Sequence, residues 1–154
     1  DVLLACDASI TLPNNVERAR MQGAELGVDT TIADWTIAGA ISYLDTENRS
    51  GFFEGNELAR RAKNSARVDV DRAFGDFRIG ITAVGEGSPY DDDANTRRLG
   101  GYGTLDLRAE YAITQSLTLQ ARVANVFDRD YETVAFYNQA GREWSLTLRY
   151  APAN

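Results

Sequence analysis

A strict alternation of apolar and polar residues is the dominant feature of this sequence. In residues 35–43, WTIAGAISY, one face carries Trp35, Ile37, Gly39, Ile41 and Tyr43, and the other carries only threonine, alanine and serine. A period of two is the mark of a β-strand with two unlike faces, because successive side chains of a strand point to opposite sides. No segment shows a convincing helical period. The chain is therefore predicted to be all-β.

The alternation recurs along the chain and predicts about seven strands. They span residues 21–32, 35–43, 64–72, 77–86, 104–113, 117–123 and 142–150, with a possible strand stub at 1–10 in which Cys6 is half-buried. Short connections (33–35, 74–77 and 114–116) alternate with long ones (roughly 47–61, 88–99 and 128–141). Strands joined by tight turns are antiparallel. The sequence thus predicts an antiparallel up-and-down meander of about seven to eight strands, with all short turns at one end.

Composition excludes several classes of function. The chain of 154 residues is expected to be one domain, and its 16 Lys and Arg against 23 Asp and Glu argue against nucleic-acid binding. It contains no histidine, which excludes histidine metal sites and Ser–His or Cys–His catalysis. The single cysteine excludes an internal disulfide and a CxxC zinc site. We therefore predict no enzyme activity, no cofactor and no metal site.

The polar faces are too charged for the core of a sandwich. Asp106, Arg108 and Glu110 lie in series on one face and belong in water or in a hydrated lumen. Three features favour lipid as the environment of the apolar faces: strands long enough to cross a bilayer, long and short connections at opposite ends, and aromatic residues at strand ends. A soluble β-barrel or meander with its apolar faces turned inward remains the alternative.

The C-terminal segment, ARVANVFDRDYETVAFYNQAGREWSLTLRY (residues 121–150), carries a recognisable motif. It closely resembles the C-terminal end of TonB-dependent outer-membrane receptors, particularly the cobalamin branch. The family pattern is Asn-Leu-Phe-Asp, two residues, Tyr, then a loop and Gly-Arg before the last strand. The matching residues are Asn125, Val126 in place of the usual leucine, Phe127, Asp128, Tyr131, Gly141 and Arg142.

The resemblance extends upstream over essentially the whole chain, through residues 15–26, 58–71 and 85–111. It implies that residues 1–154 are the C-terminal part of a barrel of about 22 strands, without the N-terminal plug. The implied location is the outer membrane of a Gram-negative cell. The implied partners are outer-membrane lipid, the remainder of the receptor chain, and TonB through the missing plug. The implied ligand is cobalamin or a ferric siderophore.

Candidate sites fall in the predicted loops and on the polar face. Five loop aromatics are candidates for ligand contact, since such rings supply rigid contact area, although packing within the loops is the alternative. These candidates are Phe52, Phe53, Tyr90, Phe136 and Tyr137. The acidic run YDDDAN (90–95) suggests calcium, but its spacing is not that of an EF-hand, and a solvated loop is the preferred interpretation. DRDYE (128–132) is interpreted as loop structure with Arg/Asp pairing rather than an acid–base pair.

Two questions stay open at this level. The charged residues of the polar face either line a transport path or form a ladder of opposite charges that stabilises the lumen, which is the preferred interpretation. These residues are Arg67, Asp69, Arg108, Glu110, Arg122 and Arg149. The second question is autonomy: the alternative function is a small self-contained β-barrel, soluble or membrane-bound, that binds a small ligand and has no transport activity of its own. Unpaired end strands would otherwise invite edge pairing.

Overall fold

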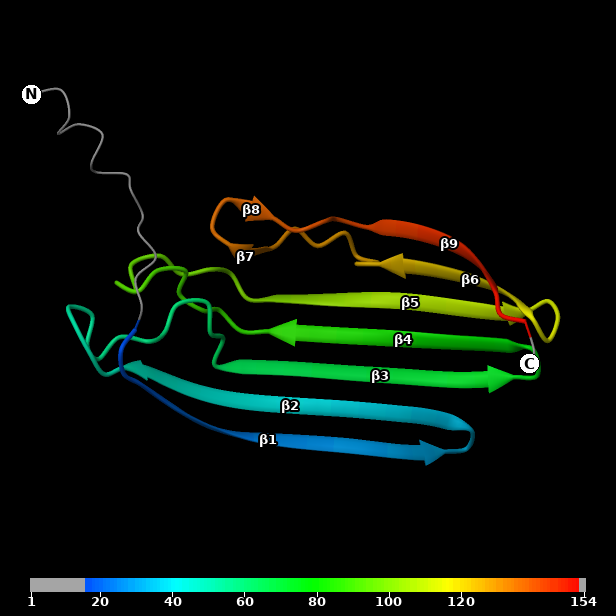
Figure 1. The fold of residues 1–154 in the computed structure, drawn as a ribbon, viewed down its shortest axis with the longest axis horizontal. Coiled ribbons are helices and arrows are strands. Elements are labelled where there is room, and N and C mark those ends of the chain that lie inside the picture. The colour runs from blue at the N-terminus through cyan, green and yellow to red at the C-terminus, as the bar shows by residue number, and fades with distance from the viewer. Residues whose placement is uncertain (1–15, 153–154) are drawn as a thin grey trace, which may run out of the picture.

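The computed structural model describes residues 16–152, and these form β-strands and loops. Seven long strands and one short hairpin are present (Figure 1). Their bounds are β1 Ala19–Ile32, β2 Trp35–Asn48, β3 Asn64–Phe74, β4 Phe77–Glu86, β5 Tyr102–Ala112, β6 Leu117–Ala124, β7 Glu132–Val134, β8 Tyr137–Asn138 and β9 Glu143–Tyr150. The predicted strand at residues 1–10, with Cys6, lies outside the described residues. No helix in residues 16–152 is long and apolar enough to cross a membrane.

The predicted meander is confirmed. The main sheet has the order β1-β2-β3-β4-β5-β6-β9, and every neighbouring pair is antiparallel. The three short turns lie at one end of the sheet and the three long loops at the other (Figure 1). The β1–β2 turn places both Ala33 and Asp34 at positive φ, which matches the twist of a two-residue hairpin.

Two local features differ from the sequence-based prediction. Strand β2 continues past Tyr43 to Asn48, because it stays paired with β1 as far as the Ala19–Asn48 pair. The last long loop also contains a hairpin of its own, β7 and β8, which forms a separate two-stranded sheet. Strands of three and two residues are too short to show an alternation in the sequence.

The strand register gathers the apolar residues on one face of the sheet. Val70 lies opposite Ile81, Ile81 opposite Leu107, Leu107 opposite Val123, and Val123 opposite Trp144. Directly opposed residues of an antiparallel pair share a face, so this row crosses five strands on one side. The intervening residues put the charged side chains on the other side. We call these the apolar face and the polar face.

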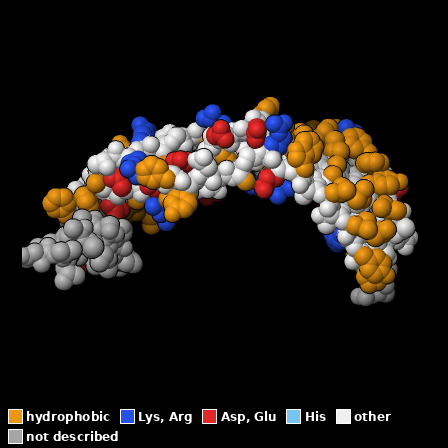
Figure 2. Space-filling view, turned by 90° about the horizontal axis from the view of Figure 1, so that it is seen from above, with side chains coloured by type: hydrophobic (Ala, Val, Ile, Leu, Met, Phe, Trp, Pro, Cys, Tyr) orange, Lys and Arg blue, Asp and Glu red, His pale blue; other side chains and the backbone are white. Residues whose placement is uncertain are grey.

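Within residues 16–152, no second layer covers either face of the sheet. Among the described residues only two hydrophobic side chains are buried, Leu99 and Ala135, and both lie in loops. Large apolar side chains of the strands are widely exposed, such as Trp144 at 75% and Leu26 at 62%. Figure 2 shows an arch with hydrophobic side chains gathered over its short-turn end and charged ones over its middle. An apolar surface of this size requires an apolar environment or partner.

The sheet is open, since the strands described pair only in the order above and β1 and β9 are not joined to each other. The geometry is therefore not that of a small closed barrel. Each end strand presents a row of backbone donors and acceptors, which in a membrane must be paired.

Candidate functional site

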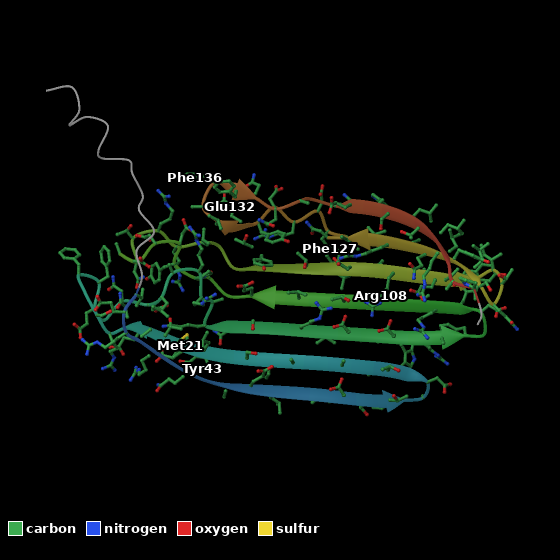
Figure 3. The ribbon with its side chains drawn as sticks, in the orientation of Figure 1. Met21, Tyr43, Arg108, Phe127, Glu132 and Phe136 are labelled. Atoms are coloured by element: carbon green, nitrogen blue, oxygen red, sulfur yellow. The ribbon has the colours of Figure 1, made fainter. Side chains whose placement is uncertain are left out.

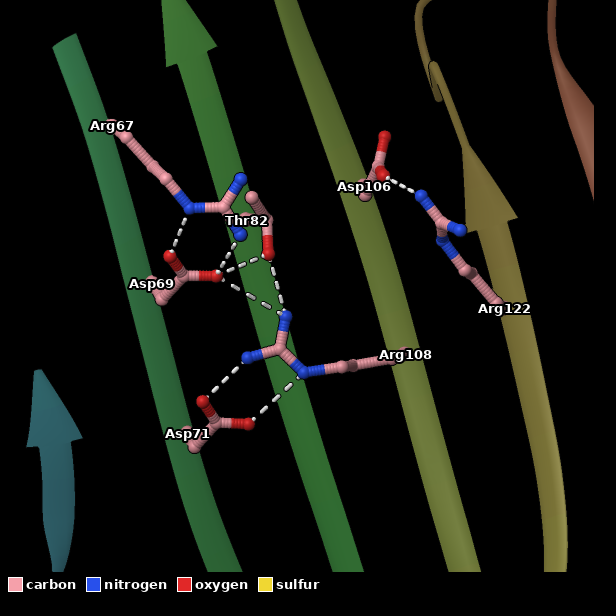
Figure 4. Close-up of polar contacts among 7 residues, drawn as sticks. All are labelled: Arg67, Asp69, Asp71, Thr82, Asp106, Arg108 and Arg122. Carbon is pink, nitrogen blue, oxygen red and sulfur yellow. Dashed lines mark hydrogen bonds and ion pairs between the residues drawn. The ribbon is translucent and has the colours of Figure 1, made fainter. Parts of the chain in front are cut away.

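The polar face carries a charge-balanced network on β3, β4 and β5 (Figure 4). Arg67 binds Asp69 through Nε at 2.6 Å and Nη2 at 3.0 Å. Arg108 donates from Nε to Asp71 Oδ1 at 3.1 Å and contacts Asp71 Oδ2 through Nη2. Thr82 joins the two pairs, because its hydroxyl donates to Asp69 at 2.6 Å and accepts from Arg108 Nη1 at 2.6 Å. Two arginines and two aspartates thus satisfy one another.

Gly80 makes room for this network. It lies between Asp71 and Arg108 in the register, on the polar face. A Cβ added there would stand 2.7 Å from Arg108 Cζ and would also clash with Arg108 Nε and Asp71 Oδ1. The side chain of Arg108 therefore crosses directly over the backbone of Gly80 to reach β3. Glycine is therefore required at this position in the middle of the strand for a steric reason.

A further ion pair joins β5 to β6, and its aspartate also links the sheet to the last loop. Asp106 on β5 pairs with Arg122 Nη2 on β6 and also accepts the backbone N–H of Asn125 at 2.9 Å. Further along, Gln120 donates to Glu110 at 2.7 Å. The predicted cross-strand pairing of opposite charges is therefore present for Asp69, Arg108 and Arg122, whereas Arg67 pairs with Asp69 on its own strand and Glu110 pairs with an amide. The ion pairs found in residues 16–152 include none to Arg149.

The Asn-Val-Phe-Asp motif closes the base of the last loop. The side chain of Asn125 is buried; its Nδ2 donates to the Arg129 carbonyl at 2.9 Å and its Oδ1 accepts from the Arg129 N–H at 2.9 Å. Asp128 accepts the N–H of Arg142 at 2.7 Å and lies 3.6 Å from its guanidinium. Both Asn125 and Asp128 have positive φ. Asn125 thus closes the turn at the start of the loop, and Asp128 joins that start to the end of the loop.

An aromatic stack holds the same loop against the sheet. The ring of Tyr131 stacks on that of Tyr102 with centroids 4.1 Å apart and an interplanar angle of 24°. The Tyr102 hydroxyl donates to Glu86 at 2.6 Å, and this hydrogen bond fixes the orientation of the Tyr102 ring. The motif tyrosine is therefore half-buried and held against Tyr102 on β5.

The other two long loops are joined by amide side chains. Asn56 donates to the Asp93 carbonyl at 2.8 Å, and Asn95 both accepts from the Glu57 N–H at 2.8 Å and donates to the Glu57 carbonyl at 2.9 Å. Arg60 donates from its backbone to the Tyr90 carbonyl and from Nε to Asp91 at 2.8 Å. The loops after β2 and β4 consequently form one connected surface.

Carboxylates of the acidic run (90–95) accept hydrogen bonds within these connected loops. Asp92 accepts from the Thr96 hydroxyl at 2.7 Å and from the backbone N–H groups of Thr96 and Arg97. The hydroxyl bond of Thr96 is the main reason that the pKa of Asp92 is lowered from its ordinary value of 3.8. In the loop after β2, the hydrogen bond from Lys63 to Glu57, 2.6 Å long, raises the pKa of Lys63. No group of three or more cysteine or acidic residues in residues 16–152 is arranged to hold a metal ion.

The five aromatic residues predicted to contact a ligand all lie at the long-loop end, but in separate places. Phe52 is 96% exposed and makes an edge contact with Phe53 at 5.2 Å. Tyr90 lies 5.9 Å from the Arg98 guanidinium, and Phe136 lies 4.6 Å from that of Arg97. Tyr137 is exposed on β8. Figure 3 shows Phe136 at this end and Arg108 within the strands. No ligand contact of these residues is tested, and their role stays a prediction.

Sequence comparison identifies the family to which this geometry belongs. Residues 2–126 match the sequence model of a family described as "TonB dependent receptor-like, beta-barrel". The chain belongs to the TonB-dependent receptor family. The predicted resemblance to this family is thereby confirmed over residues 2–126. Members of this family are outer-membrane receptors and transporters for cobalamin, siderophores or metals, and not enzymes.

Relatives and solved structures agree with this assignment. The chain is 32% identical over 139 residues to the vitamin B12 transporter BtuB of Photobacterium profundum, covering 90% of this chain and 22% of the relative. It is 26% identical to the siderophore receptor PiuA from Acinetobacter baumannii, with a TM-score of 0.76 over 86% of this chain and 22% of that one. The ferric citrate transporter FecA shares the fold with a TM-score of 0.79 at 21% identity. The chain thus spans about a fifth of the length of these TonB-dependent receptors.

Proposed function

We propose that residues 1–154 form the C-terminal part of the barrel of an outer-membrane receptor that imports cobalamin by coupling to TonB. The observation that carries the proposal is the division of the sheet into an uncovered apolar face and a charge-balanced polar face. A barrel wall needs this arrangement, with lipid on one side and a hydrated lumen on the other. The open edges at β1 and β9 are where further strands of the same receptor would pair.

Cobalamin is the first candidate for the ligand because the BtuB relative is 32% identical over nine-tenths of this chain. A ferric siderophore is the second candidate, favoured by the likeness to PiuA at 26% identity. The long loops face the outside in this proposal, so that Phe52, Phe53, Tyr90, Phe136 and Tyr137 lie where a ligand arrives. In this proposal TonB is reached through the plug of the receptor.

The test is uptake by cells that express the receptor carrying this chain. The host is a Gram-negative strain that lacks its own cobalamin receptor, in one version with and in one without TonB. We expect accumulation of radiolabelled cyanocobalamin only in the strain with TonB. A parallel assay with radiolabelled iron in ferric siderophores tests the second candidate. Uptake of neither ligand, or uptake that is equal without TonB, would contradict the proposal.

A further inference from the structure

Arg72 is the one charged residue on the apolar face between the row of Trp35 and the row of Tyr43 in the strands described. Its place on that face follows from the register, in which it lies opposite Trp35 on β2 and Ile79 on β4. A guanidinium on a surface that faces lipid is costly unless it reaches polar groups at the membrane interface. Arg72 is therefore expected to bind a polar group at the interface.

The side chain of Arg72 is directed toward the short-turn end by aromatic rings. Its Cζ lies 4.6 Å from the centroid of Phe74, two residues closer to the turn, and 5.3 Å from that of Trp35. The next row toward the turn is aromatic as well, with Phe74 opposite Phe77 and Phe77 opposite Tyr111. Aromatic belts of this kind mark the level of lipid headgroups. The guanidinium is therefore held at headgroup depth.

The hydrogen-bonding capacity of Arg72 is unused within residues 16–152. Its Nε is the one buried side-chain polar atom without a partner in this part of the chain. The nearest carboxylate oxygen is Asp34 Oδ2, 3.9 Å from Nη2, which is beyond hydrogen-bonding range. Asp34 is also 84% exposed, so its charge is largely screened by solvent. Because Nε is buried, the two terminal Nη groups are the donors left for an external oxyanion, and their planar arrangement fits two of its oxygens.

We propose that Arg72, flanked by Trp35 and Phe74, binds the phosphate group of a membrane phospholipid at the short-turn end of the sheet. The proposal rests on the outer-membrane placement given under Proposed function. The rings would cover the glycerol and the first methylenes of the lipid, while the guanidinium contacts phosphate oxygens. The apolar rows of β3 and β4 behind Arg72, with Val70 and Ile81, provide the surface for an acyl chain.

The test is native mass spectrometry of the receptor that carries this chain, in detergent, with added phosphatidylglycerol. Wild-type receptor is expected to retain phosphatidylglycerol about tenfold more than diacylglycerol with the same acyl chains, as a charge-assisted phosphate contact implies. Equal retention of the two lipids would overturn the proposal without any variant. Displacement of the lipid by millimolar inorganic phosphate alone would overturn it too, since the ligand would then be a free anion.

Three variants locate the contact. Arg72→Gln is expected to lose most of the preference for phosphatidylglycerol, and Arg72→Lys to keep part of it through its charge. Arg78→Gln is the matched control, because Arg78 lies near the same end but on the polar face. Unchanged preference in Arg72→Gln, or an equal loss in Arg78→Gln, would contradict the assignment. Mobility on unheated and heated SDS gels reports barrel formation separately, so a receptor that never forms a barrel counts against the proposed function instead.

Discussion

The guanidinium of Arg108 lies directly over the backbone of Gly80. From β5 it crosses β4 at this glycine and reaches Asp71 on β3, so that one side chain ties three strands together. In a barrel wall, backbone hydrogen bonds join neighbouring strands. A side chain on the polar face can in addition reach over one strand to the strand beyond it. Gly80 permits such a contact because it has no Cβ.

Gly80→Ala is therefore expected to destabilise the receptor. The added methyl group stands 2.7 Å from Arg108 Cζ and forces the guanidinium away from Asp71. Overpacking of this kind typically costs about 1–3 kcal/mol of unfolding free energy. The measurement is urea unfolding of the receptor in lipid vesicles, followed by tryptophan fluorescence.

Gly85→Ala is the matched control on the same strand. A Cβ at Gly85 meets nothing within 4 Å. This variant therefore changes the β-strand propensity in the same way as Gly80→Ala but creates no clash. We expect its unfolding free energy to stay within about 0.5 kcal/mol of the wild type. Equal effects of the two substitutions would show that Arg108 does not depend on Gly80.

The clamp at Asn125 provides the second prediction. Asn125→Ala removes two side-chain hydrogen bonds in a buried position. It also leaves alanine at φ 48° without the hydrogen bonds that offset the cost of this left-handed backbone. The expected loss is about 2–4 kcal/mol, the sum of the unsatisfied backbone groups and the left-handed backbone. Thermal unfolding in detergent measures it.

Comparison of Asn125→Gly with Asn125→Ala separates the two causes. Glycine tolerates positive φ, so Asn125→Gly loses only the hydrogen bonds and is expected to be the milder change. Phe127→Ala in the same motif is the control, because Phe127 is 76% exposed and its removal should cost little. If Phe127→Ala is as harmful as Asn125→Ala, the motif is not held by its asparagine.

The strands were predictable because their signal is local. Period-two alternation identified all seven long strands and the face on which Val70, Ile81 and Leu107 lie. The same rule failed to mark the short β7–β8 hairpin, whose pairing is limited to a few residues. It also gave no sign that Arg72 breaks the apolar face, since one residue in a period-two run does not change the pattern.

The contacts between loops were beyond the reach of the sequence. Asn95 joins Glu57 across 38 positions, and nothing in either segment indicates its partner. The motif at Asn125 and Asp128 was recognised by resemblance, but its clamps depend on backbone geometry at positive φ. Tyr131 was likewise recognised as a motif residue, whereas its stack on Tyr102 follows from how the loop folds back over β5.

Asp92 makes the loop after β4 sensitive to acid. Its pKa is lowered in the folded loop, chiefly by the hydrogen bond from Thr96, so the carboxylate form is favoured by folding. The resulting stabilisation is complete above the ordinary pKa of 3.8 and is lost as the pH falls through the lowered value. Hydrogen exchange of peptides covering residues 90–99, corrected for the intrinsic rate, should show constant protection near neutrality and a loss in acid.

Asp92→Asn is the control for this titration. The amide keeps one acceptor oxygen for the loop but does not titrate in this range. Its protection is expected to be lower at neutral pH and to change little in acid. A loss of protection that is the same in wild type and Asp92→Asn would assign the acid sensitivity to another group.

The predicted ligand contacts yield the last prediction. Phe136 and Tyr137 are 79% and 69% exposed, so replacing both by alanine should leave the unfolding free energy of the receptor nearly unchanged. If these rings contact the ligand, the double variant should raise the Kd for cobalamin about tenfold or more, as loss of aromatic anchors does in other interfaces. Equilibrium binding to the purified receptor measures this Kd.

Phe127→Ala is again the control, because Phe127 is similarly exposed in the same segment but lies outside the predicted set. An unchanged Kd in the double variant, or an equal rise in the control, would remove Phe136 and Tyr137 from the ligand site.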